Sequence, residues 1–185
     1  MKRFFLFFVL LLCLPSLSFG ENVSKMTMTL HFPFGYRVGS YTGTVKDGKP
    51  EGYGCFESEN SSGTSWIYVG DFANGTFHGN GRTTWFAVPT FEAGTYKNGV
   101  LVEGIILSGD YAIEGTFSDS QTITGKGKIY DSSLNLIFDG TFENSILMEG
   151  TLYDVKTGEA AITGTFGEGF KTFILNNYIR GYWYY

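Results

Sequence analysis

The stretch from Tyr68 to Gly81, YVGDFANGTFHGNG, constrains the fold of this chain more than any other part. It sets glycines at fixed offsets among aromatic residues, with Asn74 and Gly75 at its centre. An Asn-Gly pair lets both central residues of a tight turn adopt positive φ, the geometry that joins two antiparallel strands. The stretch therefore predicts a β-hairpin. The stretch from Tyr41 to Gly54, YTGTVKDGKPEGYG, has the same glycine offsets around an Asp-Gly turn.

A five-residue word recurs along the rest of the chain. It consists of an apolar residue, any residue, Gly, Thr and Phe, and it is complete in Ile113–Phe117, Phe138–Phe142 and Ile162–Phe166. With looser copies included, its glycine recurs about every 24 residues, a period typical of stacked arrays whose units bury their faces against their neighbours. We count six repeats, aligned at Gly43, Gly70, Gly94, Gly115, Gly140 and Gly164.

Strand geometry accounts for the composition of this word. Its first, third and fifth residues lie on one face of a strand. A glycine between two bulky residues leaves a hollow that an aromatic ring from the adjoining strand can fill. The word therefore predicts rings stacked over glycines. The alternative is that the glycines only mark bulges and turns.

The first twenty residues have the pattern of a secretory signal. Lys2 and Arg3 precede an apolar run that ends at Leu14, and Ser18 and Gly20 place small residues where a signal peptidase cleaves. The run is too short for a spanning helix, which needs about 20 residues. We predict that residues 1–20 are a signal peptide removed near Gly20, and that the mature protein is secreted or periplasmic.

The two cysteines bear on processing and stability. Cys13 follows Leu12, whereas a bacterial lipoprotein signal needs a small residue before the lipidated cysteine, so cleavage without lipidation is favoured. Cys55 is then alone in the mature chain, and strand pairing and burial must hold the fold without an intrachain disulfide. We expect Cys55 to be a small buried residue. Sequons that matter only in a eukaryotic secretory pathway start at Asn22, Asn60 and Asn74.

Segments that are not repeats flank the array. In residues 21–40, apolar residues from Met26 to Phe34 alternate with polar ones, which predicts a half-buried N-terminal cap strand that Pro33 places at an edge or ends. We predict a repeat array over residues 41–173 and a C-terminal capping strand over residues 174–185.

The two best copies resemble the MORN repeat (membrane occupation and recognition nexus). Tyr41–Gly54 and Tyr68–Gly81 share the pattern Tyr-x-Gly-x-aromatic-x-x-Gly-x-x-x-Gly-x-Gly, and His78 stands where the family often has histidine. The four later copies match in their first halves only. The resemblance implies an all-β fold: an open, elongated, single-layer antiparallel meander of about six β-hairpin repeats with a twisted or grooved surface. Family members act as scaffolds, as dimerising or tethering modules, or as appendages to enzymes, and lipid binding is proposed for some.

Charge excludes two classes of partner. Without Lys2 and Arg3 the chain has 11 basic and 18 acidic residues, a net charge near −7. Nucleic-acid binding needs a basic face, so this balance argues against it. The same sign argues against electrostatic docking to anionic lipid. Together with the glycines missing from the later repeats, it also argues against the lipid binding that is proposed for some family members.

The sequence offers no catalytic constellation. His31 and His78 are the only histidines, and neither has a second ligand at metal spacing. Carboxylates at Glu51, Glu103 and Glu114 and at further positions are scattered through the repeats, and a pair of them could meet across strands as in a glycosidase. We predict a protein that is not an enzyme and has no catalytic residues, metal or cofactor.

These observations favour an exported MORN-repeat protein that acts as a non-catalytic protein-interaction or scaffold module. Exposed rings at Trp66, Trp85, Tyr96 and Tyr111 are the predicted interaction surface, because Tyr and Trp dominate binding hot spots. The partner protein is not identified by the sequence, and the edge strands could pair copies into a homo-oligomer.

The sequence is compatible with two other functions. The aromatic alternation from Ile179 to Tyr185 resembles the last strand of an outer-membrane β-barrel, although apolar runs elsewhere are too short to cross a bilayer as strands. A saccharide could instead bind to the aromatic faces, and changing Trp85 to Ala would then abolish binding.

Overall fold

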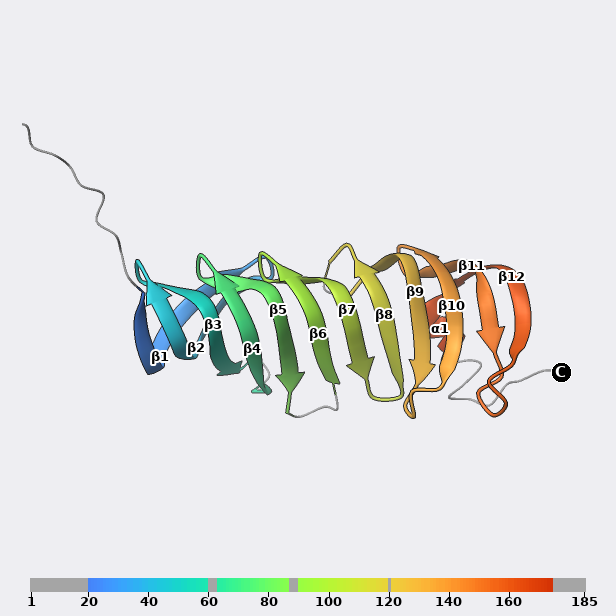
Figure 1. Cartoon of the computed structure of the whole chain (residues 1–185), viewed down its shortest axis with the longest axis horizontal. Coiled ribbons are helices and arrows are strands. Elements are labelled where there is room, and N and C mark those ends of the chain that lie inside the picture. The colour runs from blue at the N-terminus through green and yellow to red at the C-terminus, as the bar shows by residue number, and fades with distance from the viewer. Residues whose placement is uncertain (1–19, 60–62, 87–89, 120, 175–185) are drawn as a thin grey trace, which may run out of the picture.

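Twelve antiparallel strands form one open sheet in which every strand pairs with its neighbours in sequence (Figure 1). The computed structural model describes residues 20–59, 63–86, 90–119 and 121–174. β1 and β12 are the edges of an elongated meander, which confirms the predicted all-β fold class. The elements are β1 (Glu21–Phe32), β2 (Gly35–Lys46), β3 (Lys49–Glu59), β4 (Ser65–Ala73), β5 (Thr76–Trp85), β6 (Thr90–Lys97), β7 (Val100–Ser108), β8 (Tyr111–Phe117), β9 (Ile123–Asp131), β10 (Leu136–Glu143), β11 (Ile146–Tyr153), β12 (Ala160–Gly169) and α1 (Phe170–Ile174).

The predicted tight turns are present. Asn74 and Gly75 join β4 to β5 with φ of 53° and 84°, and Asp47 and Gly48 join β2 to β3 with φ of 51° and 75°. Positive φ at both central residues matches the twist of antiparallel strands, and Asn, Asp and Gly tolerate it best. The repeats that contain these turns are therefore two-stranded units, whereas the sixth repeat contributes only β12 to the described sheet.

A continuous row of glycines crosses the sheet from β2 to β12. The six glycines on which the repeats align lie on the even-numbered strands, and each pairs with a glycine on at least one neighbouring odd-numbered strand. The later repeats thus keep the glycine that fixes strand register. In order, the row is Gly43, Gly54, Gly70, Gly81, Gly94, Gly104, Gly115, Gly127, Gly140, Gly150 and Gly164.

Rings cover these glycines in three repeats. A Cβ added at Gly54 would lie 2.5 Å from Tyr41 Oη, and one at Gly150 would lie 2.5 Å from Phe138 Cζ. Tyr68 covers Gly81 in the same way. The predicted stacking of rings over glycines is confirmed there. At Gly104, in the third repeat, the nearest atoms belong to the backbone of the neighbouring strand.

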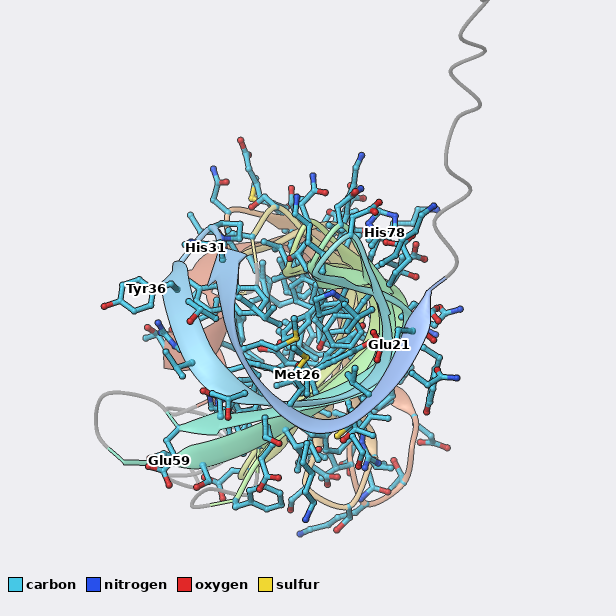
Figure 2. All side chains as sticks on the ribbon, turned by 90° about the vertical axis from the view of Figure 1, so that its left-hand side faces the viewer. Glu21, Met26, His31, Tyr36, Glu59 and His78 are labelled. Carbon is cyan, nitrogen blue, oxygen red and sulfur yellow. The ribbon has the colours of Figure 1, made fainter. Side chains whose placement is uncertain are left out.

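The strands curve around the long axis, so the sheet forms a trough whose inner face holds the core (Figure 2). Met26 points into the trough at its N-terminal end, whereas Tyr36 and His78 point outward. The core follows one face of each strand because side chains alternate between faces. The largest side chains with almost no exposed surface are those of Tyr41, Tyr68, Phe56, Phe138, Leu101, Ile123, Ile129, Ile137 and Leu147.

The tip of the β1–β2 hairpin folds back over the trough. The buried ring of Phe32 lies 4.6 Å from the ring of Phe77 on β5 and stacks on Phe34 at 4.9 Å, centroid to centroid. A Cβ at Gly99, in the β6–β7 turn, would meet Phe32 and Pro33. The hairpin tip therefore covers part of the inner face.

Helix α1 covers the trough further along. The amide of Phe170 donates a hydrogen bond to Ser145 O at 3.0 Å, and the Phe170 ring lies 5.8 Å from that of Tyr111 on β8. Phe170 and Phe173, three residues apart, share one side of the helix and are both buried. The sheet ends at Gly169, and Phe170–Phe173, predicted as the end of the array, are helical because this spacing buries both rings on one helical face.

The two ends of the chain are described in part. β1 spans Glu21–Phe32 as an edge strand that stops before Pro33. The predicted signal peptide lies outside the described residues except for Gly20, and the predicted capping strand does so except for Ile174, which ends α1. Within the described ranges, no helix has the length and apolar character needed to cross a bilayer.

Candidate binding site in the trough

An inner row of side chains, two residues from the glycine row, is interrupted by polar groups in the middle of the sheet. Every described position of this row from β2 to β12 is apolar or aromatic except Thr83 on β5 and Glu92 on β6, which are register partners. A carboxylate and a hydroxyl thus replace rings and aliphatic groups at one place. The row reads Tyr41, Phe56, Tyr68, Thr83, Glu92, Ile106, Ile113, Ile129, Phe138, Leu152 and Ile162.

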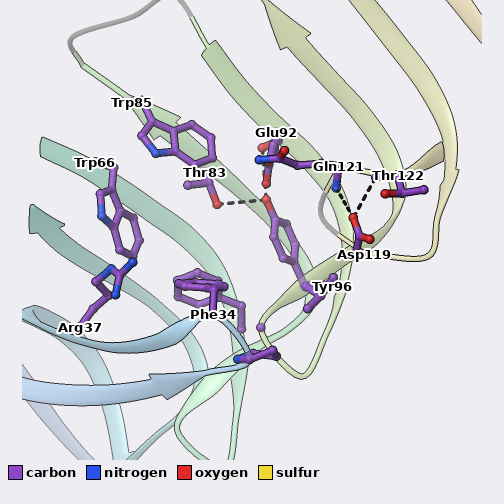
Figure 3. Close-up of a pocket in the computed structure, with 14 residues that line it drawn as sticks. Phe34, Arg37, Trp66, Thr83, Trp85, Glu92, Tyr96, Asp119, Gln121 and Thr122 are labelled. Carbon is purple, nitrogen blue, oxygen red and sulfur yellow. Dashed lines mark hydrogen bonds between the residues drawn. The ribbon is translucent and has the colours of Figure 1, made fainter. Parts of the chain in front are cut away.

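A cavity of about 740 Å³ lies over this polar interruption (Figure 3). Thr83, Glu92 and Tyr96 line it from the sheet, and Trp66 and Trp85 line it further along β4 and β5. The hairpin tip adds Phe34 and Arg37, and the β8–β9 connection adds Asp119, Gln121 and Thr122. The cavity therefore lies between the hairpin tip and the β8–β9 connection.

A second cavity, of about 300 Å³, adjoins the first. Both are lined by Trp85, Glu92 and Gln121, and the second continues to Tyr111 and Phe170. Together the two cavities make a continuous groove from the hairpin tip to α1, which we call the central groove. Glu92 lies where the two cavities meet.

Burial controls the ionisation of Glu92. The half-buried position raises the pKa of the Glu92 carboxyl to about 7, because the charged form loses solvation, while a hydrogen bond from Tyr96 opposes this. Thr83 Oγ1 and Tyr96 Oη are 3.0 Å apart, and Tyr96 Oη lies 3.5 Å from the Glu92 carbonyl oxygen. Burial also raises the pKa of Tyr96, so its phenol stays protonated.

The other charged groups of the groove already have hydrogen-bond partners or aromatic rings beside them. Asp119 Oδ1 accepts hydrogen bonds of 2.9 Å from the amides of Gln121 and Thr122, and these bonds lower the pKa of Asp119.

Arg37 Nη1 donates a hydrogen bond to Tyr36 O at 2.7 Å, and its guanidinium lies 5.3 Å from the centre of the Phe34 ring. Lys171 Nζ lies 5.9 Å from the Phe170 ring.

The structure brings the four predicted interaction residues together in the central groove. Trp66, Trp85 and Tyr96 line the first cavity, and Trp85 and Tyr111 line the second. Their expected exposure needs correction: Trp66 and Tyr96 are only 5% and 2% exposed, while Trp85 and Tyr111 are half-buried. The physical reason is the curvature of the sheet, which turns these rings into the trough.

Sequence reasoning missed Glu92, Thr83 and Arg37. The signal for Glu92 was available, because the first position of the word holds Tyr41, Tyr68, Glu92, Ile113, Phe138 and Ile162 in the six repeats. One carboxylate among five apolar residues identifies the third repeat as exceptional. Arg37 had no such signal, since the folding back of the hairpin tip brings it to the groove.

The arrangement resembles an acid–base pair only in part. One raised and one lowered carboxyl pKa in a single cavity is the pattern that separates general acid from base. Asp119, however, is exposed and binds two amides of its own turn, as a carboxylate that shapes a loop does. Among the residues that the structure places, no cluster of three or more His, Cys, Asp or Glu side chains is arranged to hold a metal ion.

Comparison with known families finds a match for the first two repeats. The family model of the MORN repeat matches residues 41–63 and 68–86, and the matched ranges include parts of β2 and β4 and all of β3 and β5. No curated protein matches the chain. Fold and family match together define an all-β repeat protein that resembles MORN-repeat proteins. Such repeats indicate a role in binding or interaction.

Proposed function

We propose that this chain is an exported, non-catalytic module that binds a segment of a partner protein in its central groove and so acts as a scaffold. The observation that carries the proposal is the gathering of Trp66, Trp85, Tyr96 and Tyr111 along one groove over the polar interruption. Aromatic residues in a concave site supply large contact areas with little loss of side-chain entropy.

The shape of the groove supports an extended segment as the occupant. The two cavities have volumes of about 740 and 300 Å³, and together they run from Phe34 at the hairpin tip to Phe170 in α1. A segment of a few residues has a comparable volume and length, whereas a flat protein surface would not enter the trough. The aromatic walls fit the apolar parts of such a segment, and Thr83 and Gln121 offer hydrogen bonds.

Export and the lack of catalysis are supported by separate features. The secretory pattern of residues 1–20 is followed directly by β1 at Glu21, so cleavage near Gly20 would leave the sheet intact. The groove contains a carboxyl of raised pKa, but Asp119, the second carboxyl that lines it, is held by backbone amides. Binding without chemistry accounts for this arrangement.

Affinity capture from the exporting cell tests this proposal. The mature chain should retain a partner protein, and Trp85→Ala, which removes a wall of the groove, should lose it. Tyr53→Ala is the matched control, because Tyr53 is 68% exposed and lies on the outer face between Gly52 and Gly54. Retention of the same partner by Trp85→Ala, or its loss with Tyr53→Ala, would contradict binding in the groove.

Saccharide binding is a second candidate, favoured by the indole rings of Trp66 and Trp85. These two residues are register partners on β4 and β5, so they stand side by side at the wall of the cavity. Sugar rings pack their C–H faces on aromatic rings, and the hydroxyls could bond to Gln121 and Glu92. Binding to purified glycans that is lost in Trp85→Ala would support this candidate, and no binding would remove it.

A further inference from the structure

Glu92 is the one residue of the inner row whose presence the fold does not explain. The other five repeats place Tyr, Ile or Phe at the same position of the word, and all of these residues except Ile162 at the edge strand are buried in the trough. Burying a carboxylate there costs free energy unless an opposite charge or several hydrogen bonds compensate it. In the described part of the chain the one ion pair joins Lys128 and Asp139, so Glu92 has no ionic partner there.

The surroundings of Glu92 match those of a cation-binding site. Rings of Trp66, Trp85, Phe34 and Tyr96 line the same cavity as the carboxyl. The face of an aromatic ring attracts a cation, most strongly where the cation is desolvated. A carboxylate surrounded by rings therefore favours a positively charged group over a neutral or a negative one.

The two cations of the groove do not fill this role. Arg37 is held by Tyr36 O and by the ring of Phe34, and Lys171 lies against the ring of Phe170 at the far end of the second cavity. Asp119, the other carboxylate that lines the first cavity, adds negative charge. Glu92, which lies at the junction of both cavities, is therefore available to pair with a cation that comes from outside the chain.

We propose that Glu92 anchors a cationic side chain, an amine or a guanidinium, carried by the partner segment that enters the central groove. This inference rests on the proposed function and specifies the chemistry of the partner. The net charge of −5 for the whole chain favours the approach of a basic segment at long range. Inside the groove, the charge of Glu92 and the aromatic rings select the cation.

Tryptophan fluorescence can report this binding. The chain has three tryptophans, and Trp66 and Trp85 line the site. A Trp183→Phe background therefore restricts the signal to the groove. The probes are the blocked pentapeptides Ac-Ala-Ala-Arg-Ala-Ala-NH₂ and its citrulline counterpart, which has almost the same shape but no charge. The arginine peptide should bind about tenfold more tightly, because one charge pair in a partly desolvated site contributes at least that much.

Two variants assign the preference to Glu92. Glu92→Gln should reduce the arginine preference to less than about twofold, the size expected when only shape and neutral hydrogen bonds remain. Glu103→Gln removes the same charge from an exposed position on β7 and should leave the preference unchanged. Equal binding of the two peptides, or an unchanged preference in Glu92→Gln, would overturn the inference.

Direct titration of Glu92 keeps the inference testable if Glu92→Gln does not fold. The carboxyl carbon of Glu92, followed by NMR in the unaltered chain, should titrate near pH 7 without peptide. Its pKa should fall when the arginine peptide is bound and should stay in place with the citrulline peptide. An unchanged pKa with both peptides would contradict an ionic anchor.

The outcomes separate this inference from the proposed function. Capture of a partner that depends on Trp85, together with equal affinity for both peptides, would leave the groove as a binding site and remove the cationic anchor. Binding of a purified glycan with no partner protein captured would overturn both proposals.

Discussion

At the scale of single residues, one substitution in the repeat pattern has the largest consequence. Five repeats place an apolar residue two positions before the glycine of the row, and the third places Glu92 there. The same repeat lacks the ring that covers the glycines of three other repeats, and a cavity of about 740 Å³ lies above it. The third repeat therefore has a polar, half-buried site where other repeats have packed apolar side chains.

Glu92 gives the ligand-free protein a characteristic pH dependence. Its folded-state pKa of about 7 lies above the ordinary value of 4.5, so the folded state binds more protons between these values. The free energy of unfolding should fall as pH rises from 4.5 to 7, by roughly 2–3 kcal/mol after solvent screening. Urea denaturation of the wild type and Glu92→Gln at pH 5 and pH 8 checks this. The variant should lose that part of the slope, and parallel curves would contradict it.

The glycine row makes a second prediction at residue scale. Alanine at Gly54 would place its Cβ 2.5 Å from Tyr41 Oη and 2.8 Å from Tyr41 Cζ, so the ring or the backbone must move. Overpacking of this kind should cost roughly 1–3 kcal/mol of stability. Gly164→Ala is the control from the same row, because nothing lies within 4 Å of its added Cβ. Its stability should stay within about 1 kcal/mol of the wild type, and equal losses in both variants would argue against stacking over glycines.

At the scale of elements, the β1–β2 hairpin and α1 decide where the trough stays open. Phe32 fixes the hairpin tip on Phe77, and Phe170 fixes α1 on Tyr111. Between these two contacts lies the central groove. The functional region is therefore defined by two segments outside the repeat word.

Phe32→Ala should detach the hairpin tip. The Phe32 ring is 8% exposed and packs against three other rings, so its loss should cost about 3–5 kcal/mol in the free energy of unfolding. Tyr36→Ala, at a side chain that is 65% exposed on the same hairpin, should change stability by less than about 0.5 kcal/mol. Chemical denaturation measures both. A small effect of Phe32→Ala would mean that the tip does not close the trough.

How far each element could be predicted depends on whether its cause is local. The Asn-Gly and Asp-Gly turns and the glycine of each word act within a few residues, so Asn74–Gly75 and the six aligned glycines predicted the turns and the strands of the repeats. The position of Phe32 over Phe77 depends on the curvature of the whole sheet. The helical turn from Phe170 arises from burial against that curved sheet, which no short pattern encodes. Glu92 was visible in the sequence as an exception to the word, but its role needed the cavity.

At the scale of the whole molecule, the chain is a curved ribbon whose sheet begins at the expected cleavage site. β1 starts at Glu21, directly after the predicted signal. Mass spectrometry of protein recovered from outside the exporting cell should show an N-terminus at Glu21 or within a few residues of it. A retained N-terminal segment on all recovered protein would contradict export by cleavage.

The central claim is that the trough of this repeat protein binds a basic segment in the cavity that Trp66, Trp85 and Glu92 line. The most direct measurement is an NMR titration of the ¹⁵N-labelled mature chain with the arginine pentapeptide. The account predicts that the indole N–H signals of Trp66 and Trp85 and the amide signals around Glu92 shift together, with one dissociation constant. Shifts confined to the outer face, with both indole signals unmoved at saturating peptide, would contradict it.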